Sequence, residues 1–143
     1  MEDDRPAIEA LIFAYAEAVD AGDLDGVARL FERAVFRSDR GGRYEGQAAV
    51  REVLSRLVIL HDDGTPRTKH VTTNVVVEVD DAAGTASARS YFTVLQATAT
   101  IPLQAIVTGR YHDRFVREGG RWRFADRLVF MDLVGNVTDH LRT

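Results

Sequence analysis

An acidic side chain at the end of a predicted helix is the first group in this sequence whose position suggests chemistry. Asp20 lies at the margin of that helix's apolar stripe and at its C-terminus, where the helix dipole disfavours a negative charge. Such a carboxylate needs a compensating interaction. Solvent or a capping bond within the DAGD turn would provide one, and so would a hydrogen bond to an imidazole across a pocket. Both explanations fit the sequence.

His70 begins a predicted strand, HVTTNVVVEV, and shares one strand face with Thr72 and Asn74. Val71 and Val75 belong to the other face. The polar face could contact solvent or line a cavity, and a bulge would change the alternation further along. A lone histidine near a strand end is more often structural or exposed than catalytic. Combined with an aspartate it can accept a proton, because the carboxylate fixes its tautomer and stabilises the imidazolium.

Tyr15 lies near the middle of the apolar stripe of the first helix, so its ring should point inward and its hydroxyl should need a partner. A core tyrosine bonded to a backbone group is, for this residue alone, the better explanation. A pocket tyrosine that donates a hydrogen bond or a proton is the alternative. The stripe around it consists of Ile8, Leu11, Ile12 and Val19.

Helices are predicted in the first half of the chain and strands in the second. Asp3 or Asp4 can cap a first helix that runs to the carboxylate described above, and Gly22 can end it. Asp23 can cap a short second helix, and apolar spacing in residues 48–60 predicts a third. Long segments rich in β-branched and aromatic residues follow, joined by tight turns, which favours an antiparallel meander.

The composition is that of one globular domain, which we assign to residues 1–143. Apolar residues make up 45% and charged residues 28%, and no apolar run approaches the ~18 residues of a membrane span. The start lacks the features of a signal peptide, so a cytoplasmic location is expected by default. The net charge of −4 argues against nucleic-acid binding.

Several kinds of site are disfavoured by the residues that would form them. Without cysteine there is no disulfide and no thiolate site. His61, His112 and His140 show no metal-binding spacing, and no phosphate-binding loop or serine-nucleophile motif occurs. We therefore expect neither a metal nor a cofactor.

Helices followed by a meander predict segregated α+β layers, because the apolar side of each layer must be covered by the other. A strongly bent sheet folded against three N-terminal helices would leave a hollow between them, and ligands favour such hollows. We expect an α+β fold in which a curved, mixed or antiparallel sheet forms a cone around a single pocket.

Several segments together resemble the SnoaL-like branch of the nuclear transport factor 2-like superfamily over nearly the whole chain. They are YAEAVDAGDLDGVARLF, YEG, KHVTTN and GRYHDRFVREGGRWRF, followed by an apolar C-terminal strand. Enzymes of that superfamily include scytalone dehydratase, a bile-acid dehydratase, a hexachlorocyclohexane dehydrochlorinase and polyketide cyclases. Several of these use an Asp/His pair across the cone, which the resemblance implies here too.

The resemblance also implies roles for individual residues. Asp20 and His70 match the aspartate and histidine of that pair, and Tyr15 resembles the tyrosine of the dehydratases. Arg127 resembles an arginine that lines the dehydrochlorinase pocket, although strand alternation places it with two solvated arginines unless a bulge intervenes. The second histidine or acid of the dehydratases is missing from the segment ARSYFTV. Further substrate-binding candidates are Arg110, Tyr44 and Tyr91.

The expected function is that of a lyase, isomerase or cyclase acting on a small, largely apolar molecule. His70, held by Asp20, would remove a proton from carbon, and Tyr15 would donate a hydrogen bond or proton to an oxygen. The alternative is a non-catalytic binding or assembly module, in which Asp20 and His70 would lie apart or one would face solvent. With either function we expect a homodimer or homotrimer, because exposed valines and aromatics of the last three strands suit an interface between copies.

Overall fold

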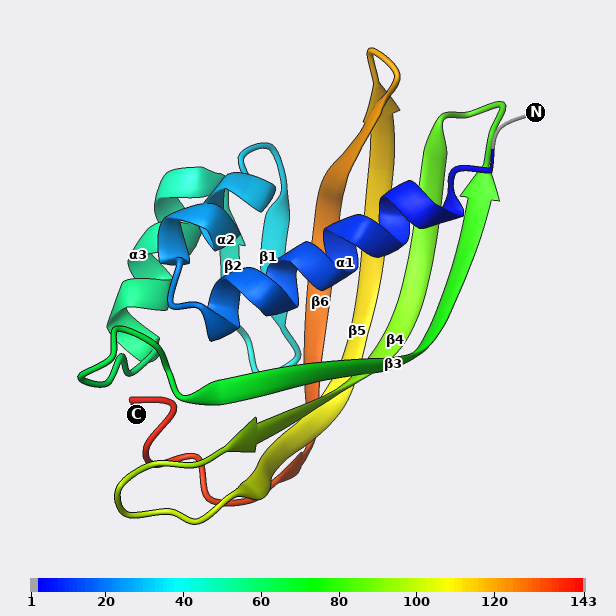
Figure 1. Ribbon diagram of the computed structural model, residues 1–143. Coiled ribbons are helices and arrows are strands. Elements are labelled where there is room, and N and C mark those ends of the chain that lie inside the picture. The colour runs from blue at the N-terminus through cyan, green and yellow to red at the C-terminus, as the bar shows by residue number, and fades with distance from the viewer. Residues whose placement is uncertain (1–2, 143) are drawn as a thin grey trace.

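Three helices lie against the concave side of a curled sheet in the computed structural model, which describes residues 3–142 (Figure 1). The helices are α1 (Arg5–Asp20), α2 (Leu24–Leu30) and α3 (Gln47–Leu57). The strands are β1 (Val35–Ser38), β2 (Arg43–Glu45), β3 (Thr68–Asp80), β4 (Thr85–Gln96), β5 (Gln104–Glu118) and β6 (Arg121–Val134). The predicted α+β order, with helices before the long strands, is confirmed.

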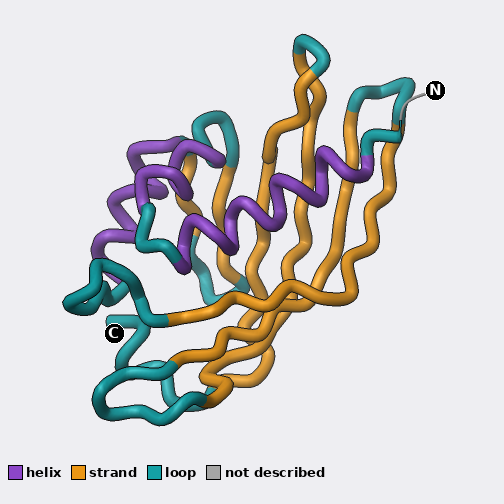
Figure 2. Tube along the Cα trace, in the orientation of Figure 1, coloured by secondary structure: helices purple, strands orange, loops and turns teal. Residues whose placement is uncertain are grey.

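The sheet is mixed and stays open. Its strands run in the order β2-β1-β6-β5-β4-β3, so β2 and β3 form its edges. Neighbouring strands are antiparallel except β1 and β6, which run parallel. Helix α1 crosses the sheet from β3 towards β6, and α2 and α3 lie beside β1 and β2 (Figure 2). The inner side of the curled sheet therefore faces the helices.

The turn after α1 brings two distant segments together. Gly22 has a φ of 73°, which favours glycine, and a Cβ at this position would overlap the carbonyl oxygen of Gly64. The loop before β3 thus packs directly on the C-terminal end of α1. Asp23 caps α2 as expected, by accepting a hydrogen bond from a backbone N–H of its first turn at 2.9 Å. Asp4 precedes α1 but pairs with Arg117 at 2.9 Å instead of capping.

The apolar spacing predicted a helix over residues 48–60, whereas α3 ends at Leu57. The residues that follow Leu57 pair with the C-terminal segment instead of continuing the helix. Val58 is extended and forms an isolated bridge with Leu141. The N–H of Ile59 donates a hydrogen bond to the carbonyl oxygen of His140 at 2.9 Å. These contacts satisfy the backbone without a further helical turn.

A bulge at Asn74 divides β3 into two halves with opposite alternation. The pairing with β4 shifts just after Thr73, and Asn74 has a left-handed φ of 55°. His70 therefore points toward the helices before the bulge and Val75 does so after it, whereas Val71 is 40% exposed. The prediction that Val71 and Val75 share a face is wrong for this reason.

A second bulge reverses the alternation of β6. The pairing of β6 with β5 shifts by one residue beside Phe124, which leaves Ala125 as the extra residue. Arg127 consequently points into the molecule and is fully buried, whereas Arg121 is exposed. Arg127 was expected to point inward only if a bulge intervened, and this bulge is present.

The core fills the space between the helices and the inner sheet face. Phe124 stacks on Phe31 of the loop after α2, with ring centroids 5.0 Å apart, and packs at a tilt against Phe115 of β5, with centroids 4.8 Å apart. Within residues 3–142 no helix has the length and apolar character needed to cross a membrane.

The bulge at Asn74 can be tested by its backbone conformation. Asn74→Val should lower the free energy of unfolding by about 1–2 kcal/mol, because a β-branched residue fits the left-handed region poorly. Asn74→Gly should cost less than this. Urea denaturation measures both, with Thr73→Val as the matched control in ordinary strand geometry. Equal stability of Asn74→Val and Thr73→Val would show that residue 74 does not need a left-handed backbone.

Candidate active site

The last residue of α1 and the first residues of β3 meet through hydrogen bonds to one carboxylate. Asp20 Oδ1 lies 2.6 Å from His70 Nδ1 and accepts a hydrogen bond from Thr68 Oγ1 at 2.9 Å. Asp20 Oδ2 accepts one from the backbone N–H of His70 at 2.8 Å. The side chains of His70 and Asp20 are only 8% and 12% exposed. This contact leaves His70 Nε2 as the ring nitrogen that Asp20 does not engage.

The donors around Asp20 keep it ionised. Burial alone would raise the pKa of Asp20, but the hydrogen bond and charge of His70 act against burial. Together with the bonds from the His70 backbone and from Thr68, they hold the pKa of this carboxyl below its usual value. An ionised carboxylate only accepts hydrogen bonds, so the shared proton belongs to His70 Nδ1. When the imidazole is neutral, its lone pair is therefore on Nε2.

His70 lines an apolar cavity of about 340 Å³ between the helices and the inner sheet face. Tyr15 and Tyr44, both predicted site residues, line the same cavity. Asp20 lies behind His70 and is not part of the cavity wall. The wall is otherwise mostly aliphatic and aromatic, and includes Phe36, Leu54, Phe92, Val94, Tyr111 and Met131.

A buried ion pair lies behind two of the cavity tyrosines. Arg127 Nε and Nη2 donate hydrogen bonds to the two carboxylate oxygens of Asp113 at 2.8 and 2.9 Å, and both side chains are 0% exposed. The guanidinium carbon lies 3.6 Å from the ring centroid of Tyr111 and 4.3 Å from that of Tyr15. Arg127 is thus covered by the tyrosines and does not line the cavity, and its role in substrate binding stays a prediction.

The ion pair sets the electrostatic environment of both hydroxyls. Burial raises the pKa of Tyr15, and the positive charge of Arg127 partly offsets this effect. Burial also raises the pKa of Tyr111 well above its usual value. Burial acts to lower the pKa of Arg127, but the charge and hydrogen bonds of Asp113 raise it above its usual range. Both tyrosines are therefore protonated hydrogen-bond donors beside a fixed positive charge.

Arg110 and Tyr91 lie on the outer side of the sheet, away from this cavity, and their role in substrate binding stays a prediction. Tyr91 is 53% exposed, and Arg110 pairs with Asp132 at 2.8 Å. Tyr91 is followed by Phe92 and Arg110 is followed by Tyr111, and both following residues line the cavity. Neighbouring residues on a strand point to opposite faces, which explains their outward position.

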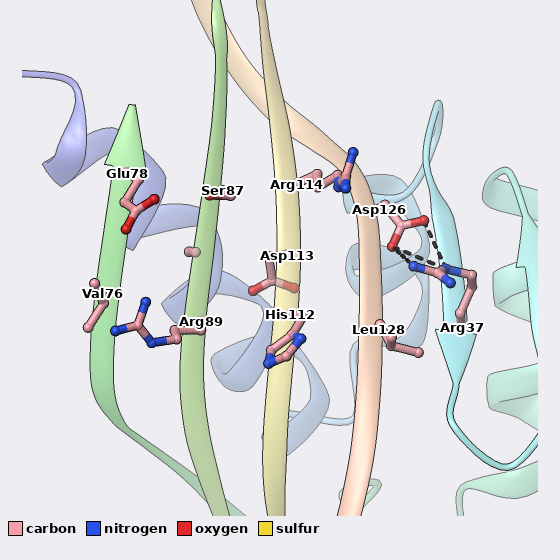
Figure 3. A pocket seen from close by; sticks show the side chains of 11 residues that line it. Arg37, Val76, Glu78, Ser87, Arg89, His112, Asp113, Arg114, Asp126 and Leu128 are labelled. Carbon is pink, nitrogen blue, oxygen red and sulfur yellow. Dashed lines mark hydrogen bonds and ion pairs between the residues drawn. The ribbon is translucent and has the colours of Figure 1, made fainter. Parts of the chain in front are cut away.

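The outer face of the sheet carries an open hollow of about 380 Å³ (Figure 3). Its walls are polar and include the Arg37–Asp126 ion pair at 2.8 Å. His112 on this face packs against Phe130 and contacts no carboxylate in the described part of the chain. We therefore place the site in the inner cavity. The homodimer or homotrimer expected from exposed side chains such as Tyr91 stays a prediction.

His140 is a cavity residue for which the sequence offers no local signal. It is 5% exposed, lines the same cavity, and has its ring centroid 5.9 Å from that of His70. Its position depends on the docking of the C-terminal segment against α3, which no periodicity reveals. Burial and the charge of His70 lower the pKa of His140 to about 4. The ring is therefore neutral near neutral pH.

The groups around the cavity are of the kinds that take part in proton transfer. A histidine oriented by an ionised carboxylate, protonated tyrosines and a neutral second imidazole surround one apolar cavity. Among residues 3–142 no three His, Asp or Glu side chains gather in a group that could hold a metal ion.

Fold and site together define a small α+β domain whose apolar cavity holds a histidine–carboxylate pair. The SnoaL-like domain family matches residues 2–128, and the chain belongs to this family. The family includes dehydratases, isomerases and cyclases. The comparison with curated proteins gives no match.

Solved structures share this fold over most of the chain. An Asp-to-Asn variant of Rv3472 from Mycobacterium tuberculosis, a protein of unknown function, is 30% identical. That match has a TM-score of 0.74 and covers 93% of this chain and 78% of that one. LinA is 19% identical, with a TM-score of 0.73 and coverage of 98% and 94%. A protein provisionally assigned as a scytalone dehydratase, from Novosphingobium aromaticivorans, is 23% identical, with a TM-score of 0.71 and coverage of 91% and 85%.

The low pKa of His140 predicts a loss of stability in acid. The unfolded chain binds a proton at this residue below about pH 6.5, whereas the folded protein binds it only below about pH 4. The free energy of unfolding should therefore fall by about 3 kcal/mol as the pH is lowered through this window. Asp20 affects stability at lower pH, because its contribution to the free energy of unfolding is lost only as the pH falls through the lowered pKa of its carboxyl.

Urea denaturation at a series of pH values measures this effect. The non-ionisable variant His140→Gln should show a shallower decline than the wild type between about pH 6.5 and pH 4. Parallel curves in this window would mean that His140 is not neutral and buried in the folded protein.

Proposed function

We propose that this protein is a cofactor-independent lyase, isomerase or cyclase in which His70 acts as the general base. The observation that carries the proposal is the 2.6 Å contact between His70 Nδ1 and an ionised Asp20 behind the cavity wall. This contact fixes the tautomer with an unprotonated Nε2, and such a nitrogen beside an apolar cavity can accept a proton. The carboxylate then stabilises the imidazolium that forms.

The reaction starts at a C–H bond next to an activating group. His70 Nε2 takes the proton, and the electron pair of the C–H bond forms a new C=C bond. In an elimination, a group on the neighbouring carbon leaves with its electron pair. In an isomerisation or cyclisation, an adjacent carbonyl oxygen takes up the negative charge. The hydroxyl of Tyr15, close to the charge of Arg127, donates a hydrogen bond to the oxygen that gains charge or departs.

The cavity indicates the class of substrate. Its volume of about 340 Å³ lies near the lower end of the range for small-molecule sites, about 300–1,000 Å³. Aromatic side chains such as Phe36 and Phe92 form part of its wall, and most of its surface is apolar. A small, largely apolar molecule with one activated C–H bond and one oxygen fits this lining.

The alternative of a non-catalytic binding or assembly module has less support. It predicted that Asp20 and His70 would lie apart or that one of them would face solvent, whereas the two side chains are in contact and 12% and 8% exposed. Membership of a family that includes dehydratases, isomerases and cyclases also supports an enzyme. The more distant likenesses, to LinA and to the provisional scytalone dehydratase, concern the fold alone.

The ring opening of 5-nitrobenzisoxazole tests the general base, because removal of its C–H proton yields a coloured phenolate without any cofactor. The wild type should convert this probe with saturation. His70→Ala should lower kcat by about 10²–10⁴-fold, the usual contribution of a positioned base. Asp20→Asn should lower it by about tenfold or more, because the amide no longer fixes the tautomer or stabilises the imidazolium.

His112→Ala is the matched control, because this histidine lies on the outer face of the sheet. Its kcat should equal that of the wild type, and thermal denaturation should show that all the variants fold. Undiminished turnover in His70→Ala would contradict the proposal. So would a wild-type rate no greater than that of free imidazole at the same concentration.

A further inference from the structure

The C-terminal segment brings a second imidazole into the cavity. His140 follows β6, and its carbonyl oxygen accepts a hydrogen bond from the N–H of Ile59 at 2.9 Å. The next residue, Leu141, forms a bridge with Val58. These backbone contacts fix the segment against the end of α3. The imidazole of His140 is thereby held in the cavity wall, with the residue only 5% exposed.

The residue before His140 is also firmly anchored. The carboxylate of Asp139 accepts hydrogen bonds from the hydroxyls of Thr98 and Thr100 at 2.7 and 2.8 Å. The backbone carbonyl oxygen of Asp139 accepts a hydrogen bond from the side-chain amide of Gln96 at 3.2 Å and lies 2.9 Å from His61 Nε2. These contacts fix the backbone from which the His140 side chain projects.

His140 and His70 face the same space. Their ring centroids are 5.9 Å apart and their planes are inclined by 67°. At this separation a substrate group of a few atoms can contact both rings. The proposed mechanism uses His70 to remove a proton and leaves His140 without a role.

The hydrogen-bonding state of His140 indicates what it can do. Nδ1 is buried and has no hydrogen-bond partner within residues 3–142. A buried N–H without a partner is rarer in proteins than a buried acceptor without one, so Nδ1 carries the lone pair and Nε2 carries the proton. Nε2 is then the nitrogen that can reach the cavity. The pKa of His140, lowered to about 4, is consistent with a neutral ring.

We propose that His140 is a second catalytic residue, which donates a hydrogen bond from Nε2 to the substrate oxygen that becomes negative when His70 removes the proton. This inference rests on the proposed function of His70. The proton passes to His70, the C–H electron pair forms the C=C bond, and the negative charge moves to the oxygen. His140 keeps its own proton. Its N–H and the hydroxyl of Tyr15 together stabilise the developing charge.

Ligand binding tests the donor separately from turnover. 4-Nitrophenolate carries a negative oxygen but no acidic C–H bond that a base could cleave, and nitrobenzene has a similar ring without the phenolate oxygen. By calorimetry at about pH 8, His140→Phe should weaken phenolate binding by about tenfold or more, as expected for a lost hydrogen bond to a charged group. Nitrobenzene affinity should change little. His140→Gln keeps an N–H donor and should retain much of the phenolate affinity.

Turnover of 5-nitrobenzisoxazole provides the second measurement. His140→Phe should lower kcat by about 10²-fold, and His140→Gln should recover part of the loss. Equal phenolate affinity and equal kcat in the wild type and His140→Phe would overturn the inference and leave the role of His70 intact. Phenolate binding that depends on His140, in a protein whose turnover does not depend on His70, would support the donor and reject the proposed base.

Discussion

The carboxylate of Asp20 ties the C-terminus of α1 to the start of β3, and the geometry of the site depends on this connection. Hydrogen bonds from Thr68, from the backbone of His70 and from its ring compensate for burial and for the unfavourable helix dipole. The close packing of Gly22 on Gly64 brings the two segments within reach. Because the same carboxylate binds both the backbone and the ring of His70, it sets the position of this residue and the orientation of its imidazole.

Irregular points in the strands decide which side chains meet at the cavity. The bulge at Asn74 allows His70 to face the cavity while the later valines of β3 still face the core. The bulge at Ala125 turns Arg127 inward, where Asp113 neutralises it and Tyr15 and Tyr111 cover it. A buried ion pair therefore lies behind the tyrosines without lining the cavity.

Sequence patterns predicted the parts of the site that follow from regular structure. The apolar stripe placed Tyr15 on the inner side of α1, and the helix end made Asp20 unusual. Strict alternation along a strand would also have placed Arg110 and Tyr91 outside, since Tyr111 and Phe92 beside them face inward. Family resemblance, not periodicity, joined Asp20 to His70. Bulges and the docking of the C-terminal segment are set by tertiary contacts, so the burial of Arg127 and the place of His140 could not be derived from the sequence.

The tautomer of His70 tests the proposed function most directly, because the proposed base requires an unprotonated Nε2 toward the cavity. Long-range nitrogen–proton NMR correlation spectra of ¹⁵N-labelled protein distinguish the two neutral tautomers, at a pH where the imidazole is neutral. We predict that the proton of His70 is on Nδ1 in the wild type and that this preference weakens in Asp20→Asn. A wild-type spectrum with the proton of His70 on Nε2 would contradict this prediction.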